Sequence, residues 1–171
     1  MKHIIFTTLM LLVSSCTTKQ TSKTATVGEW YMGNLEGKSF KLGSQENIEL
    51  IKRASEAYNA MDSEKLMSYF SENAKIYSYS GEELQVSKEL YQSYFATLDS
   101  LKWEPHGMST QTLEDDSIAV VSIPSTDIRY LKDQEIQAGF LFERFWIVDG
   151  KITTIVQYKR ESAKNYDEIE L

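Results

Sequence analysis

One two-residue turn near the C-terminus constrains the fold of this chain more than any other feature. Asp149-Gly150 separates two long runs, 136–148 and 152–160, that are rich in aromatic and β-branched residues. Asp-Gly between such runs is a strong signal for a type I′ β-hairpin, so the two runs are expected to pair as antiparallel strands. The chain must therefore build a sheet around this hairpin.

The register counted outward from this turn pairs Val148 with Lys151 and Glu143 with Val156. Because side chains alternate along a strand, the hairpin has two separate faces. The face with Glu143 is expected to carry Leu141, Phe145, Ile147, Ile152, Thr154, Val156 and Tyr158. The other face is expected to carry Phe140, Phe142, Arg144, Trp146, Thr153, Ile155 and Gln157.

Both faces of the hairpin are mostly apolar, so both are expected to pack against other parts of the protein or against a partner. Helices are expected to cover one face. We expect a second copy to cover the other, giving a homodimer through Phe140, Phe142 and Trp146. The alternative is that the apolar segment 30–42 covers this face within the same chain.

Helical patterns precede the strands. Apolar residues at three- and four-residue spacing predict a helix over about 45–61, with Ser44 as its N-cap. Asp62 and Ser87 are expected to cap two further helices. The strand-like runs are 74–79, 103–113, 118–128, 136–148 and 152–160. Helices followed by antiparallel strands predict an α+β domain with the helices on one face of the sheet.

The N-terminus carries a targeting signal. Lys2 and His3 precede residues 4–13, of which only two threonines are not apolar. A helix of ten residues spans about 15 Å, half the hydrocarbon core of a membrane, so residues 1–15 are typical of a cleaved signal peptide. Cys16, the only cysteine, follows Val-Ser-Ser, which resembles a bacterial lipobox and implies a lipid anchor on Cys16.

Four segments follow from these patterns: the lipoprotein signal peptide 1–15, a tether and docking segment 16–43, one domain 44–162, and an acidic tail 163–171. The tether lacks the acidic residue after cysteine that commonly retains Gram-negative lipoproteins in the inner membrane. The resemblance favours the outer membrane, facing the periplasm. Lipid on Cys16 is the only membrane attachment expected.

The residues AYNAMDSEKLMSYFSENAKIY around Asp62 and WIVDGKI at 146–152, in this order of elements, resemble the nuclear transport factor 2-like superfamily. The SnoaL-like and ketosteroid-isomerase-like branches fit best, over about 44–162. The resemblance implies three N-terminal helices packed on a strongly curved mixed or antiparallel sheet that forms a conical pocket, a cystatin-like roll. It also implies dimerisation through the convex sheet face.

Glu143 is the most informative charge, because it interrupts an apolar strand. A buried carboxylate must be paired, open to a pocket, or protonated. Tyr158 is expected close to it, on the same face. The resemblance implies that an acid at this position stays protonated and donates to a substrate oxyanion, as in ketosteroid isomerase.

The remaining isomerase machinery does not carry over. The catalytic base of those relatives falls at Ser78, and their phenolic donor falls at Ala54, so the sequence favours a protein that is not an enzyme. The other side chains expected in the pocket are Tyr58, Tyr77, Ser78, Tyr91, Tyr94, Leu141 and Phe145.

Other groups near the pocket leave alternatives open. His106 could act as a base opposite Glu143, although a lone histidine near a strand end is more often a surface residue. Asp127 and Arg129 could line the mouth, but we expect them to pair on the surface.

Charge and motifs exclude several functions. The net charge is −7 with no basic stripe, which disfavours nucleic acid as a partner. No metal-ligand spacing or glycine-rich phosphate loop occurs, so we expect no metal and no cofactor. The leading hypothesis is a non-catalytic binder of a small apolar molecule. The alternatives are an isomerase, dehydratase or cyclase that uses His106 and Glu143, and a dimeric protein-interaction module.

Overall fold

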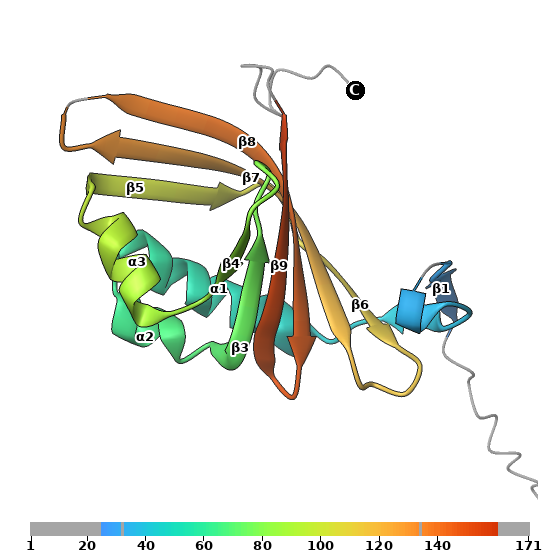
Figure 1. Ribbon diagram of the computed structural model, residues 1–171. Helices are drawn as coiled ribbons and strands as arrows, with labels where there is room; N and C mark the ends of the chain where they lie inside the picture. The colour runs from blue at the N-terminus through green and yellow to red at the C-terminus, as the bar shows by residue number, and fades with distance from the viewer. Residues whose placement is uncertain (1–24, 32, 134, 161–171) are drawn as a thin grey trace, which may run out of the picture.

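The computed structural model describes residues 25–31, 33–133 and 135–160 (Figure 1). The predicted signal peptide, Cys16 and the tail 163–171 lie outside the described residues and stay predictions, as does the location in the cell envelope. The helices are α1 (Gln45–Asn59), α2 (Ser63–Met67), α3 (Lys88–Phe95) and the short 3-10 helix η1 (Gly33–Leu35). The strands are β1 (Thr26–Glu29), β2 (Ser39–Leu42), β3 (Phe70–Tyr77), β4 (Glu83–Gln85), β5 (Leu98–Pro105), β6 (Ser109–Leu113), β7 (Ala119–Leu131), β8 (Ile136–Val148) and β9 (Lys151–Arg160).

The strands of the described residues form one mixed sheet in the order β1-β2-β6-β7-β8-β9-β3-β4, and β5 also pairs with β7. Only β3 and β9 run parallel among these pairs. The first part of β7 pairs with β6 and the last part with β5. In Figure 1 the long β7–β8 hairpin bends over the three helices, so that sheet and helices enclose a core between them. The expected α+β architecture is confirmed.

The helix starts follow the predicted caps. The Asp62 carboxylate accepts a hydrogen bond from the Lys65 amide at 2.9 Å, and the Ser87 hydroxyl accepts one from Leu90 at 3.1 Å. Ser44 stands at the N-cap of α1 without a side-chain hydrogen bond to the helix. The apolar stripe of α1 is buried against the sheet, as its spacing predicts.

The hairpin between β8 and β9 is tight, but its register shifts by one residue after the second residue pair from the turn. Asp149 and Gly150 both have positive φ, 50° and 69°, as a type I′ turn requires. The predicted pairing of Val148 with Lys151 is confirmed. Beyond Ile147 the register shifts, because Thr153 is an extra residue on β9 whose hydroxyl donates to the Trp146 carbonyl at 3.2 Å.

Because of this bulge, the side chains of β9 after Thr153 lie on the face opposite to the expected one. Glu143 lies opposite Gln157, so the predicted pairing with Val156 is wrong. Tyr158 pairs with Phe142 on the outer face, where its side chain is 54% exposed. The predicted place of Tyr158 in the pocket is therefore wrong, because a shift of one residue moves every side chain to the opposite face.

The segment before α1 packs on the outer face of the sheet. β2 extends the sheet through β6, so the sheet continues past the expected boundary at residue 44. The Trp30 ring lies 5.3 Å from Trp146 and 6.1 Å from Phe40, edge to face. Trp30 therefore packs on this part of the face within the same chain, and a dimer contact through the half-buried Trp146 stays a prediction. Phe140 is half-buried and Phe142 is 42% exposed, and a homodimer through them stays a prediction.

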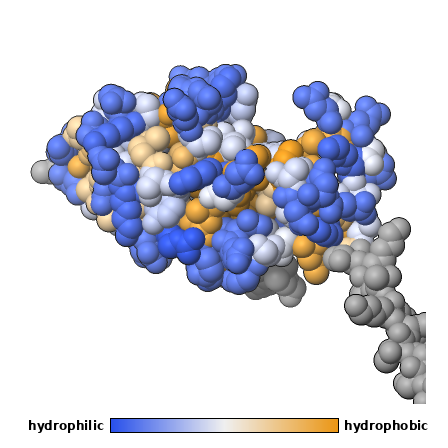
Figure 2. Space-filling model, turned by 90° about the horizontal axis from the view of Figure 1, so that it is seen from below, coloured by the Kyte–Doolittle hydropathy of each residue, from blue (hydrophilic) through white to orange (hydrophobic). Residues whose placement is uncertain are grey.

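Polar side chains cover most of the face seen in Figure 2, with apolar side chains gathered toward its middle. Among the described residues, the helices are too short or too polar to cross a membrane.

Candidate functional site

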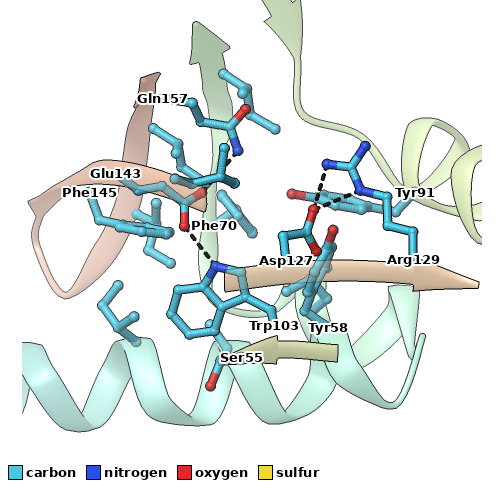
Figure 3. A pocket seen from close by; sticks show the side chains of 17 residues that line it. Ser55, Tyr58, Phe70, Tyr91, Trp103, Asp127, Arg129, Glu143, Phe145 and Gln157 are labelled. Atoms are coloured by element: carbon cyan, nitrogen blue, oxygen red, sulfur yellow. Dashed lines mark hydrogen bonds and ion pairs between the residues drawn. The ribbon is translucent and has the colours of Figure 1, made fainter. Parts of the chain in front are cut away.

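A cavity of about 80 Å³, called the inner cavity below, lies between α1 and the concave face of the sheet. At about 30 Å³ for each molecule of liquid water, this volume corresponds to two or three waters, or to about one small ring. Most of the surrounding side chains are apolar (Figure 3). The lining residues are Ile51, Ala54, Ser55, Tyr58, Leu66, Phe70, Ile76, Tyr91, Trp103, Asp127, Arg129, Leu141, Glu143, Phe145, Ile152, Ile155 and Gln157.

Glu143 lies in the cavity wall and is 3% exposed. Three donors from three other strands bind its carboxyl group. The Trp103 indole N–H and the Ser125 hydroxyl donate to Oε2 at 2.7 and 2.9 Å, and the Gln157 amide donates to Oε1 at 2.9 Å. Glu143 therefore joins β5, β7, β8 and β9 at one point.

Burial raises the pKa of Glu143 above its ordinary value, and the charge of Asp127 acts in the same direction. The bonds from Gln157, Trp103 and Ser125 oppose this rise. The expectation that Glu143 is a buried acid with a raised pKa agrees with this environment. Its acceptor oxygens are already bound, so Glu143 serves first as the polar centre of the wall.

Asp127 and Arg129 form a second polar group at the edge of the inner cavity. Arg129 donates to Asp127 Oδ2 through Nε at 2.6 Å and through Nη2 at 2.5 Å. Asp127 is only 3% exposed, so the expected surface pair is instead a buried one. Burial raises the pKa of Asp127, and the Arg129 charge opposes this effect.

The second oxygen of Asp127 lacks a donor within the described part of the chain. Oδ1 is buried and has no hydrogen-bond partner among the described residues. Figure 3 shows one oxygen of Asp127 turned toward Arg129 and the other turned away from it. A buried acceptor without a donor costs free energy that an incoming donor would recover.

Tyrosines hold this end of the cavity in place. The Tyr58 and Tyr94 hydroxyls lie 3.2 Å apart, and the Arg129 guanidinium lies 5.7 Å from the centre of the Tyr94 ring. Burial raises the pKa of Tyr58 well above its ordinary value, and the charge of Asp127 adds to the effect. Tyr58 and Tyr91 line the cavity as expected, whereas Tyr94 lies behind them.

His106 lies on the opposite face of the sheet from Glu143. Its Nε2 is 2.8 Å from the Thr126 hydroxyl, and its ring is 5.5 Å from Phe140. Thr126 and Phe140 pair on the outer face, because their neighbours Asp127 and Leu141 point inward. The predicted pairing of His106 with Glu143 as base and acid is therefore wrong.

Two more residues expected in the pocket also lie elsewhere. Tyr77 is 40% exposed, because it alternates with the buried Ile76 on β3. The Ser78 hydroxyl lies in the turn after β3, where it accepts a hydrogen bond from the Glu82 amide at 3.2 Å. Ala54 does line the cavity. This is the position at which the resemblance to the isomerase branch implies a phenolic donor.

The three donors to Glu143 and the buried position of Asp127 were not predicted from the sequence. A usable signal was present on β7, where Ala119, Val121 and Ile123 alternate as inward positions. Continued to the end of the strand, this alternation turns Ser125 and Asp127 inward as well. Within the described residues, no cluster of three or more His, Cys, Asp or Glu side chains could hold a metal ion.

No family model matches the chain, and no curated protein matches it. Solved structures do resemble it. A ketosteroid isomerase-like protein from Erwinia carotovora atroseptica matches with a TM-score of 0.57 and 12% identity, over 69% of this chain and 96% of its own. An NTF2-like protein of unknown function from Exiguobacterium matches with a TM-score of 0.53 and 16% identity, over 66% of this chain and 99% of its own.

A third structure, an uncharacterised protein with a cystatin-like fold from Caulobacter vibrioides, has a TM-score of 0.56 and 13% identity. It matches over 73% of this chain and 92% of its own. At such identities the likeness concerns the fold. The chain has the nuclear transport factor 2-like fold, as the residues around Asp62 and Asp149-Gly150 led us to expect.

Proposed function

We propose that this protein binds a small, largely apolar molecule in the inner cavity without converting it. The observation that carries the proposal is the Asp127 carboxylate, which is fixed by Arg129 through one oxygen and leaves the other, Oδ1, buried without a donor. The ligand would place one ring or a short branched chain against the apolar wall and donate a hydroxyl or amine hydrogen to Oδ1. Ligand sites of this kind combine apolar walls with a few fixed polar groups.

The arrangement of the acid–base candidates favours binding over catalysis. His106 lies across the sheet from Glu143, and the base and phenol positions of the isomerase branch hold Ser78 and Ala54. Glu143 is engaged by three protein donors. Asp127 is left as the polar anchor for a ligand.

The test compares two small ring compounds: benzyl alcohol, whose hydroxyl can donate a hydrogen bond, and benzaldehyde, whose oxygen can only accept one. At about pH 8, calorimetry on the full-length protein should show benzyl alcohol binding roughly tenfold more tightly than benzaldehyde, since a bond to a charged acceptor contributes about 1.5–3 kcal/mol before desolvation is subtracted. Asp127→Asn should abolish this preference, because the oxygens of both probes can accept from the new amide. The two Arg129 donors would keep the Asn oxygen, so its N–H₂ group would face the ligand and donate.

A matched control is Asp149→Asn, which makes the same chemical change in the remote hairpin turn. This control variant should bind benzyl alcohol and benzaldehyde within about twofold of the wild-type affinities, a difference of less than about 0.5 kcal/mol. Equal affinity of the wild type for benzyl alcohol and benzaldehyde would contradict the role of Asp127. No binding of either probe would contradict the proposed function as a whole.

A further inference from the structure

The Asp127–Arg129 pair lines both the inner cavity and a second pocket. This outer pocket, about 30 Å³, shares Asp127, Arg129 and Leu141 with the inner cavity and is completed by residues that include Tyr79 and Lys159. The two spaces therefore meet at one ion pair.

Two cations line the outer pocket, and each lies over an aromatic ring. The Lys159 ammonium is 5.0 Å from the centre of the Tyr79 ring, and the Arg129 guanidinium is 5.7 Å from the centre of the Tyr94 ring. Such contacts contribute about 0.5–1 kcal/mol at exposed sites, so they favour a fixed position for each cation. Arg129 contacts Asp127 Oδ2 through Nε and Nη2, and its Nη1 has no hydrogen-bond acceptor among the described residues.

The sign of the charge at this pocket is opposite to that of the whole chain. Arg129 and Lys159 outnumber Asp127, which leaves one net positive charge in the lining, whereas the chain carries −7. A local positive site on an acidic surface concentrates anions against the general field. Lys159 lies on the same face of β9 as Gln157 and pairs with Leu141, which lines both spaces.

We propose that the ligand is an amphipathic organic anion, with its apolar part in the inner cavity and a carboxylate in the outer pocket between Arg129 and Lys159. This inference rests on the proposed function and adds the class of ligand to it. A hydroxyl beside the carboxylate would still reach Asp127 Oδ1, so small hydroxy acids with one ring fit both polar groups. Arginine and lysine are the side chains that bind carboxylates by charge-assisted hydrogen bonds.

The experiment uses mandelate and its neutral amide, mandelamide, both as single enantiomers. They share the ring and the hydroxyl and differ in the third group, which is a charged carboxylate in one and a neutral amide in the other. Calorimetry on the full-length protein at low ionic strength should give an affinity for mandelate about three to ten times that for mandelamide. Added salt should reduce this ratio, because Lys159 is exposed and screened.

Lys159→Gln should weaken mandelate binding about threefold and leave mandelamide and benzyl alcohol within about twofold. The matched control is Arg160→Gln, which removes the same charge one residue away on the outer face, opposite Phe140. It should leave mandelate binding within about twofold.

Two results would overturn the inference and leave the proposed function standing: equal affinities for mandelate and mandelamide, or equal losses from Lys159→Gln and Arg160→Gln, while benzyl alcohol still binds. If benzyl alcohol, mandelate and mandelamide all fail to bind, the proposed function itself is wrong.

Discussion

Replacing Glu143 with alanine is expected to lower the free energy of unfolding by about 3–5 kcal/mol. The substitution leaves the donors of Trp103, Ser125 and Gln157 without their acceptor inside the protein. Each buried donor left unpaired costs about 1–3 kcal/mol, and the three costs are not additive because they share one site. Urea unfolding followed by circular dichroism measures the change.

Glu143→Gln serves as the conservative variant and should cost only about 1 kcal/mol. Its amide oxygen still accepts from Trp103 and Ser125, and the Gln157 amide can turn its own oxygen toward the new N–H₂ group. Glu104→Ala, on the exposed side of β5, should change stability by less than about 0.5 kcal/mol. A loss below about 1 kcal/mol for Glu143→Ala would show that this residue does not hold the four strands together.

Replacing Arg129 with glutamine is expected to destabilise the protein by about 3–5 kcal/mol at about pH 8, because it leaves the buried Asp127 carboxylate unpaired. The loss should shrink strongly near pH 4. Burial already raises the pKa of Asp127, and the Arg129 charge opposes that effect, so removing Arg129 raises this pKa further. A carboxyl group with a raised pKa in the folded state is destabilising once ionised.

The sign of this pH dependence is fixed. Below the pKa that Asp127 has in the unfolded chain, the group is protonated in both states and the variant keeps its stability. As the pH rises through the higher pKa of the folded state, the unfolded chain releases the proton more readily and stability falls. The double variant Arg129→Gln/Asp127→Asn should remove this pH dependence. A loss for Arg129→Gln that is the same at pH 4 and pH 8 would contradict the buried ion pair.

The sequence predicts the scaffold well, because its signals are local. The Asp62 and Ser87 caps, the apolar stripe of α1 and the Asp149-Gly150 turn each depend on neighbours within a few residues. These local signals agree with one another and with the order of elements.

One extra residue explains the largest error at the site. Thr153 carries no feature that distinguishes a bulge from a regular strand position, since its hydroxyl bond to Trp146 depends on the folded sheet. A register counted through Thr153 without a bulge places Tyr158 on the face of Glu143, whereas Gln157 lies there in the structure. A register argument is therefore reliable only as far as the first bulge.

His106 and the strand run 103–113 show a second limit. Pro105 and Gly107 break that run into β5 and β6, and both of these strands pair with β7. The direction of the His106 side chain depends on this break, which the pattern of apolar residues does not contain. Asp127 and Arg129 are two residues apart on one strand, so their pairing could be predicted from the sequence. The burial of Asp127 depends on the curvature of the β7–β8 hairpin.

The most direct test of a ligand in the inner cavity uses the three tryptophans of the chain as reporters. Trp103 lines the inner cavity, whereas Trp30 and Trp146 pack together on the outer face. In a ¹H–¹⁵N NMR titration with benzyl alcohol, the indole signal of Trp103 should shift saturably while those of Trp30 and Trp146 stay in place. Equal shifts of all three signals, or a shift confined to Trp30 and Trp146, would contradict binding in the inner cavity.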